Sequence, residues 1–167
     1  MNLNDAQRLI LANQYRLMAL LEPSEKRHFQ RLQTLVEKGF EKELSVLTED
    51  FTHLNTNTCQ EVYDTMEMYH ALQTSYSLLN REQQSDIDER RLRFLGYDAM
   101  KENELVDYVR FLILEDGHYP EWRQQEHNFD AQVVMRPKYQ AMLMRFKQCP
   151  RQYHLCANEI KQIFNAH

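Results

Sequence analysis

The sequence predicts an all-α protein, a compact multi-helix domain of about seven or eight helices. The 167 residues include only three Gly and four Pro, whereas sheet proteins need more of these residues for their tight turns. Apolar side chains recur at steps of three and four along most of the chain, which is the spacing of one helix face. Capping residues precede several of these runs.

Three helices are predicted in the first third of the chain. The first begins near Asn4, which has Gln7 three residues later as a capping partner, and stops before Pro23. Ser24 can cap the second, which ends at Gly39, where a C-terminal glycine is expected. The third follows at once, with apolar residues at steps of four, three and four, namely Phe40, Leu44, Leu47 and Phe51.

The longest helix is predicted at residues 57–80, as the central helix of the fold. Thr58 and Glu61 can form a capping box, in which the hydroxyl accepts from the Glu61 amide and the carboxylate accepts from the cap amide. The apolar seam of this helix, which can pack along another helix, consists of Val62, Met66, Tyr69, Leu72, Tyr76 and Leu79.

The second half of the chain is less regular. After a polar linker at residues 80–86, Ser85 can cap a helix that Gly96 closes, and a further helix ends at Gly117. Residues 118–134 show no helical period, and loops longer than about 12 residues are often functional or mobile.

Two more helices follow. Pro137 suits the first turn of one of them, Pro150 ends it, and a last helix completes the chain. Hydrophobic residues make up 43% and charged residues 27%, which is typical of a globular protein. A chain of this length most often forms one domain. We therefore expect a single domain over residues 1–167, with a soft division near residues 80–86.

The net charge and the cysteine pattern indicate which partners and which cell compartment to expect. The net charge of −5 gives no support for nucleic-acid binding, which normally needs a basic face. The three cysteines are odd in number and contain no Cys-x-x-Cys pair, and with no signal peptide this indicates reduced thiols in the cytoplasm. The apolar N-terminal run does not predict a membrane span, because it carries Arg8, Asn13, Gln14 and Arg16.

The long helix contains a spacing that metal sites use. Asp64, Glu67 and His70 lie three residues apart, and Glu-x-x-His pairs bind metal in di-iron bundles. At about 100° per residue, however, the two acidic residues point away from the apolar seam, and His70 lies at its border. A second such pair, Glu115 and His118, spans a glycine that ends its helix. We therefore expect no metal site and no cofactor. Of the residues in these two motifs, only His70 remains a candidate for contact with a ligand or partner.

Catalytic motifs are weak. Cys149, His154 and Cys156 do not match a zinc site, because the cysteines are seven residues apart and no fourth ligand is evident. The same residues do not predict a cysteine nucleophile, since nothing locates an oxyanion hole. No Gly-rich phosphate loop, Gly-x-Ser-x-Gly elbow or His-Glu-x-x-His is present, which argues against an enzyme without excluding one.

Several polar residues remain as candidates for a ligand. Spacing predicts two i,i+4 ion pairs in the run SDIDERRLRF, which leave Arg91 without such a partner. Arg151, at a helix junction, and His154 are similarly unassigned, and the three residues form a candidate polar pocket for an acidic ligand. Trp122 and its aromatic neighbours indicate a lid or an interface, or else a loop pinned to its own core.

Four segments, NDAQRLILANQYRLM, TMEMYHALQ, SDIDERRLRFLGYDA and CPRQYHLCANEIKQI, resemble the YfbU family of bacterial proteins. They match in order and spacing from near the N-terminus to the last helix. The resemblance implies an all-helical fold and a bacterial cytoplasmic setting, and it carries no catalytic or cofactor-binding residue over to this sequence. Related domains are sometimes joined to a helix-turn-helix segment, which implies ligand or partner sensing.

We therefore expect a self-associating binding or regulatory module without catalysis. Its partners would be further copies of the chain, another protein or a small acidic ligand, with no membrane. Nucleic-acid binding is a less favoured hypothesis, because it would require a contiguous basic face. The alternative is a small-molecule sensor or small enzyme whose polar pocket is built from Arg91, Arg151 and His154. His70 and Trp122 are further candidates for contact with a ligand or partner.

Overall fold

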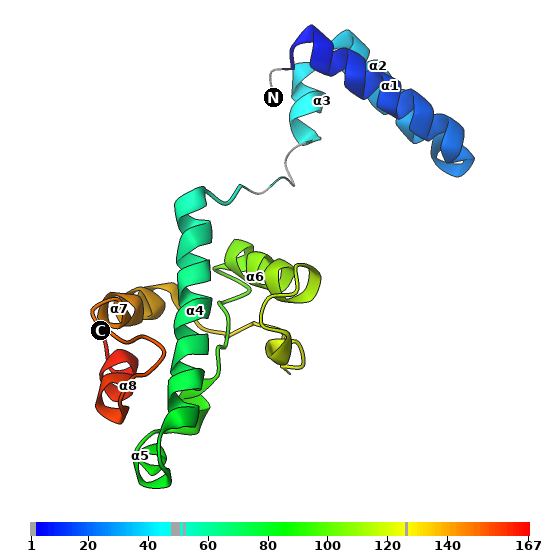
Figure 1. Cartoon of the computed structure of the whole chain (residues 1–167). Helices are drawn as coiled ribbons and strands as arrows, with labels where there is room; N and C mark the ends of the chain where they lie inside the picture. The colour runs from blue at the N-terminus through cyan, green and yellow to red at the C-terminus, as the bar shows by residue number, and fades with distance from the viewer. Residues whose placement is uncertain (1–2, 48–50, 52, 126) are drawn as a thin grey trace. The chain divides into compact units, whose positions relative to one another are not determined.

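The computed structural model contains eight α-helices and no β-strand in the residues that it describes, which are 3–47, 51, 53–125 and 127–167 (Figure 1). The all-α prediction is therefore confirmed for these residues. Backbone contacts divide the chain into two compact units, residues 1–53 and 54–167. The segment 80–86 lies inside the second unit.

The first unit consists of α1 (Asp5–Leu21), the 3-10 turn η1 (Pro23–Glu25), α2 (Lys26–Lys38) and α3 (Glu41–Val46). Asn4 caps α1 as predicted, because its side chain accepts from the Gln7 amide at 2.9 Å and the Gln7 side chain accepts from its amide at 3.0 Å. Gly39 ends α2 with a φ of 70°. The third helix is shorter than predicted and ends before Phe51, and residues 48–50 lie outside the described residues.

The first unit has a small core between α1 and α2. Ser24, which we expected to cap α2, lies in η1 instead, because Pro23 opens a 3-10 turn there. Arg8 of α1 donates to the carbonyl oxygen of Val36 at 2.9 Å and to that of Glu37 at 2.6 Å. These bonds satisfy two acceptors that the end of α2 leaves unpaired. The buried residues of this core are Ala12, Leu32, Leu35, Val36 and Leu44.

The second unit is built around α4 (Thr56–Leu78), the longest helix of the described residues. Its other elements are α5 (Arg81–Ser85), η2 (Glu89–Leu92), α6 (Asn103–Arg110), η3 (Phe111–Glu115), η4 (Pro120–Trp122), α7 (Arg136–Phe146) and α8 (Ala157–Phe164). Figure 1 shows α6 on one side of α4 and α7 on the other, and both helices contact α4.

The predicted long central helix at 57–80 is confirmed to within two residues at each end. Its cap is Asn55 rather than Thr58, because the Asn55 side chain accepts from the Thr58 amide at 2.9 Å. Glu61 consequently takes no part in a capping box and accepts from Arg136 of α7 at 2.8 and 3.0 Å.

The segment 80–96 differs from its prediction. Its first residues form the short helix α5, capped by Asn80 and Gln83, where we expected a linker. No helix then reaches Gly96. Instead, Asp88 caps the 3-10 turn η2, and the chain leaves that turn in an extended conformation.

Gly96 marks a close approach of two backbones rather than the end of a helix. Its φ is 82°, and a Cβ at this position would lie 2.0 Å from the carbonyl oxygen of Phe129. The Tyr97 amide donates to this same oxygen at 3.1 Å, and the Ala131 amide donates to the Tyr97 carbonyl at 2.8 Å. The segment around Gly96 is thereby bound to the irregular stretch 118–134.

The stretch 118–134 is fixed to the core of the second unit by its aromatic rings. Trp122 is 3% exposed and Phe129 is 2% exposed. The Trp122 indole donates to the Gln73 side chain of α4 at 3.0 Å, and its ring lies 5.3 Å from that of Phe94. Of our interpretations of this stretch, the loop pinned to its own core is therefore the one that the contacts support.

Candidate functional site

Large apolar side chains are exposed along one side of α1. At about 100° per residue, five of the six such side chains fall within an arc of about 120°, Met18 (40% exposed) lies outside the arc, and the buried Ala12 and Ala19 point away from it. Single exposed leucines are common on proteins, but five within one arc, which also holds the exposed Asn13, form a candidate contact patch. We call this patch the α1 apolar face, and it consists of Leu9 (64% exposed), Ile10 (58%), Leu17 (59%), Leu20 (69%) and Leu21 (77%).

A hollow of about 430 Å³ borders the α1 apolar face at Leu17. Its other lining residues are Leu11, Gln14, Tyr15 and Met18. This lining contains no carboxylate, imidazole, thiol or amine, so the chemistry available here is the burial of apolar groups from another surface.

The charges around η2 form one long-range pair and one local pair instead of the predicted helical pairs. Asp86 contacts Lys161 of α8 at 3.2 Å, and Asp88 contacts Arg90 at 2.9 Å. The i,i+4 pairs that helical spacing predicts are not formed between the described residues, since this segment is a 3-10 turn with three residues per turn.

Arg91 is bound to the end of α8. Its guanidinium donates to the Asn165 side chain at 3.0 Å and to the Phe164 carbonyl oxygen, and it lies 4.8 Å from the centroid of the Phe164 ring. It also lines a cavity of about 430 Å³, whose lining includes neither Arg151 nor His154. Those two residues share a turn before α8, where the His154 amide donates to the Arg151 carbonyl. The cavity beside Arg91 is thus not the three-residue pocket that we predicted.

His70 lies between two tyrosine rings of the second unit. The ring centroids of Tyr119 and Tyr153 are 5.2 and 5.9 Å away, and Nε2 of His70 lies 3.9 Å from the Glu121 carboxylate. Tyr119 in turn stacks on Trp122 at 4.5 Å. His70 is therefore a half-buried border residue, and Trp122 is too deeply buried to contact a partner directly.

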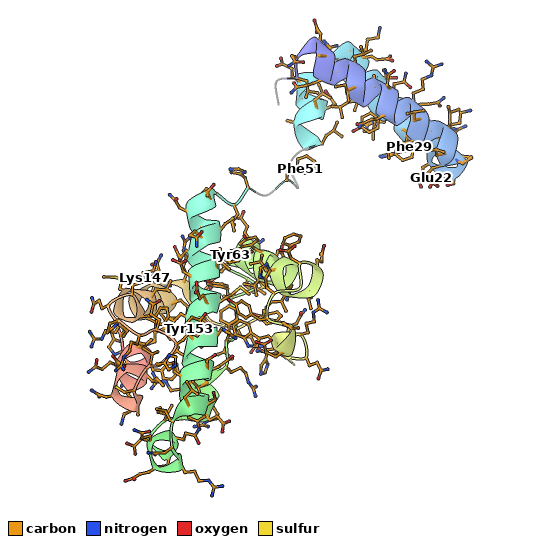
Figure 2. All side chains as sticks on the ribbon, in the orientation of Figure 1. Glu22, Phe29, Phe51, Tyr63, Lys147 and Tyr153 are labelled. Carbon is orange, nitrogen blue, oxygen red and sulfur yellow. The ribbon has the colours of Figure 1, made fainter. Side chains whose placement is uncertain are left out.

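The acidic residues of α4 bind separate partners and do not form one cluster of carboxylates. Lys147, labelled in Figure 2, donates to Asp64, which is half-buried where we expected it to face water. Burial acts to raise the pKa of Asp64, but hydrogen bonds from Lys147 and Gln60 lower it overall. Among the residues that the structure describes, no group of three His, Cys, Asp or Glu side chains could hold a metal ion.

A polar cluster that the sequence patterns do not single out joins α4 to the end of η3. Nε2 of His118 lies 3.0 Å from the Tyr63 hydroxyl and 3.0 Å from the Asp116 carboxylate (Tyr63 is labelled in Figure 2). Spacing pairs His118 with Glu115, but Gly117, with a φ of 79°, turns the chain so that Asp116 becomes the partner. Because both partners meet the same nitrogen, that nitrogen is not available to a substrate.

The two C-terminal cysteines differ in burial and in their local contacts. Cys149 is buried, and burial raises the pKa of its thiol, which lowers its reactivity as a nucleophile. Cys156 is exposed and caps α8, with its amide donating to Glu159 at 2.8 Å.

A family model described as the YfbU domain matches residues 1–166, essentially the whole chain. The chain belongs to the YfbU family. The match covers both units, so the α1 apolar face and the cavity beside Arg91 both belong to the YfbU domain. Within its described residues, this YfbU domain has no helix that combines the length and the apolar character needed to cross a membrane.

Two cations of the YfbU domain that spacing does not single out also line the cavity beside Arg91. Sequence reasoning does not single out Arg93, because on a helix Arg93 would form one of the two predicted i,i+4 ion pairs, with Glu89. Lys138 lies in the first turn of α7, and its Nζ donates to the carbonyl oxygens of Phe164 and Ala166 at 2.7 and 2.8 Å. The sequence does not indicate that these cations surround one cavity, because only folding brings them together.

Proposed function

We propose that this YfbU domain is a cytoplasmic, non-catalytic binding and regulatory module that self-associates through the α1 apolar face. The observation that supports the proposal is the exposure of five large apolar side chains on a helix whose other face is already packed. Large apolar side chains exposed together on one helix face mark a candidate interaction surface. A second copy offers a covering surface of the same kind, in a contact that closes as a symmetric dimer.

The size of the α1 apolar face suits a dimer contact. Burying one exposed leucine or isoleucine side chain contributes on the order of 1–2 kcal/mol. Five such side chains from each of two copies contribute on the order of 10–20 kcal/mol, against an association cost of about 4–15 kcal/mol. We therefore expect association at micromolar concentrations.

The first unit also gains stability from such a contact. Its own core contains five buried apolar residues among those described, and small units with small cores commonly rely on oligomerisation. Two α1–α2 hairpins that pair through α1 form a four-helix arrangement, in which α1 is covered on both sides.

Sedimentation of the full chain at about 1–100 µM tests the proposal. We expect the wild type to form a dimer and the double variant Leu17→Lys/Leu20→Lys to remain a monomer with unchanged helical circular dichroism. Met100→Lys is the matched control, because Met100 is 90% exposed and lies outside this face. This variant should sediment as a dimer, like the wild type. A monomeric wild type at about 100 µM, or a dimer that survives the double variant, would refute the proposal.

A further inference from the structure

The cavity beside Arg91 has a charge opposite to that of the whole chain. It is lined by four cationic side chains and one carboxylate, a net charge of +3, whereas the chain carries −5. Its volume of about 430 Å³ lies in the range of small-molecule sites, about 300–1,000 Å³. The charged lining residues are Asp88, Arg90, Arg91, Arg93 and Lys138.

Two of these cations are held in place by uncharged acceptors. Lys138 donates to carbonyl oxygens at the end of α8, and Arg91 donates to the Phe164 carbonyl and the Asn165 side chain. These bonds fix both groups without neutralising them. Burial and the positive charge of Arg91 both lower the pKa of Lys138, as expected where cations lie together with too few carboxylates.

Arg93 is the cation that is open to a ligand. Its guanidinium makes no hydrogen bond or ion pair with the residues that the structure describes, whereas Arg90 already binds both oxygens of Asp88, at 3.0 and 2.9 Å. Arg93 also lines an adjoining cavity of about 530 Å³. A guanidinium offers five donors in a planar fork, which suits the oxygens of a phosphate or a carboxylate.

The floor of the cavity is apolar. Three of its lining residues are almost fully buried, namely Tyr69 (4% exposed), Met142 (2%) and Phe164 (3%), and Leu95 and Met135 complete the apolar lining. Burial raises the pKa of Tyr69, which therefore stays a neutral phenol. Methionine side chains adapt to ligands of varied shape, so this floor suits an aryl or alkyl group.

We propose that this cavity binds a small anion that carries an apolar group, such as an aryl phosphate monoester or an arylacetate. The oxyanion lies among Arg91, Arg93 and Lys138, and the apolar group lies against Met135 and Met142. Cationic groups at one side and an apolar floor at the other make binding depend on both parts of the ligand.

Isothermal titration of the full chain with four probes tests this dependence. Phenyl phosphate and phenylacetate carry both parts of the ligand, inorganic phosphate carries the anion alone, and benzyl alcohol carries the ring alone. We expect at least one of the first two probes to bind about tenfold more tightly than either of the last two. Comparison of phenyl phosphate with phenylacetate identifies the preferred oxyanion.

Two variants and a control localise the site. Arg93→Gln should weaken binding about tenfold, and it breaks no bond between described residues. Met142→Leu should shift the preference among ring-bearing probes while leaving inorganic phosphate unaffected. Arg81→Gln removes an exposed arginine that does not line this cavity, and it should bind like the wild type.

Methyl NMR gives a readout that does not depend on affinity. The methyl resonances of Met135 and Met142 should shift when the ring-bearing anion that binds in the titrations is added, and the resonance of the exposed Met100 should not shift. If neither ring-bearing anion binds, if inorganic phosphate binds equally tightly, or if Arg93→Gln and Arg81→Gln behave alike, the proposal is wrong.

Discussion

Gly96→Ala should strongly destabilise the second unit, because a side chain at this position meets backbone atoms. The new Cβ would lie 2.0 Å from the carbonyl oxygen of Phe129 and 2.6 Å from its carbonyl carbon. The φ of 82° is also one that L side chains rarely adopt. The variant must therefore strain its own backbone and displace that of residue 129.

The magnitude follows from what these two changes break. A non-glycine residue in the left-handed region costs about 1–2 kcal/mol. Displacing Phe129 weakens two hydrogen bonds, from the Tyr97 amide at 3.1 Å and from the Ala131 amide at 2.8 Å, each contributing about 1 kcal/mol. With some loss of packing around the buried Phe129 ring, we expect a total of about 3–5 kcal/mol.

Gly117→Ala is the matched control. Gly117 has nearly the same φ, 79°, but the nearest atom to its added Cβ is the flexible end of Arg123, at 3.6 Å. This variant should lose only the cost of backbone strain, about 1–2 kcal/mol. Urea unfolding followed by the fluorescence of Trp122, which is buried in the same unit, measures both variants. If they differ by less than about 1 kcal/mol, the close approach of Gly96 to Phe129 is refuted.

Two more predictions concern α4. Hydrogen bonds from Arg136 lower the pKa of Glu61 below its ordinary 4.5 against the opposing effect of burial. A depressed folded-state pKa contributes stability that is present above pH 4.5 and lost as pH falls through the folded value. Glu61→Gln should therefore lower the free energy of unfolding by on the order of 1 kcal/mol at pH 7. It should also make that free energy, measured by urea unfolding, depend less on pH in the acid range, and an unchanged pH dependence would contradict this. Trp122→Phe should cost about 2–3 kcal/mol by circular dichroism, since it leaves the Gln73 oxygen without its donor, and a cost below about 0.5 kcal/mol would show that the indole is not anchored.

The elements that could be predicted are those whose apolar faces repeat over several turns. The long helix α4 has such a face, and its ends were predicted to within two residues. Its cap was wrong by three positions. Asn55 and Thr58 both suit a cap, and Glu61, the capping partner expected for Thr58, binds Arg136 instead. Local spacing cannot report a partner that is 75 residues away.

The region from 80 to 96 could not be predicted for a different reason. The helix α5 has no buried residue, so its sequence has no apolar residues at helical spacing and resembles a polar linker. Helical spacing beyond it assigned ion pairs to a segment that is a 3-10 turn. Gly96 looked like a helix end because a positive φ is common there, whereas its role depends on contact with Phe129.

The predicted polar pocket and the cavity beside Arg91 have only Arg91 in common. Arg91 is bound to the end of α8, and the cationic residues beside it include Arg93 and Lys138 rather than Arg151 and His154. Arg93 directly follows η2 and Lys138 lies in α7, and no spacing rule connects them. The α1 apolar face was readable as an apolar run, but which of its residues remain exposed depends on how α2 packs.

The local character of the first unit bears on the order of events during synthesis. The capping bonds of α1, the bonds from Arg8 to the end of α2, and the buried core all lie within residues 4–44. A nascent chain can therefore fold this hairpin while residues 54–167 are still being translated, since domains fold as units and N-terminal ones fold first. The α1 apolar face would then be formed before the second unit is complete.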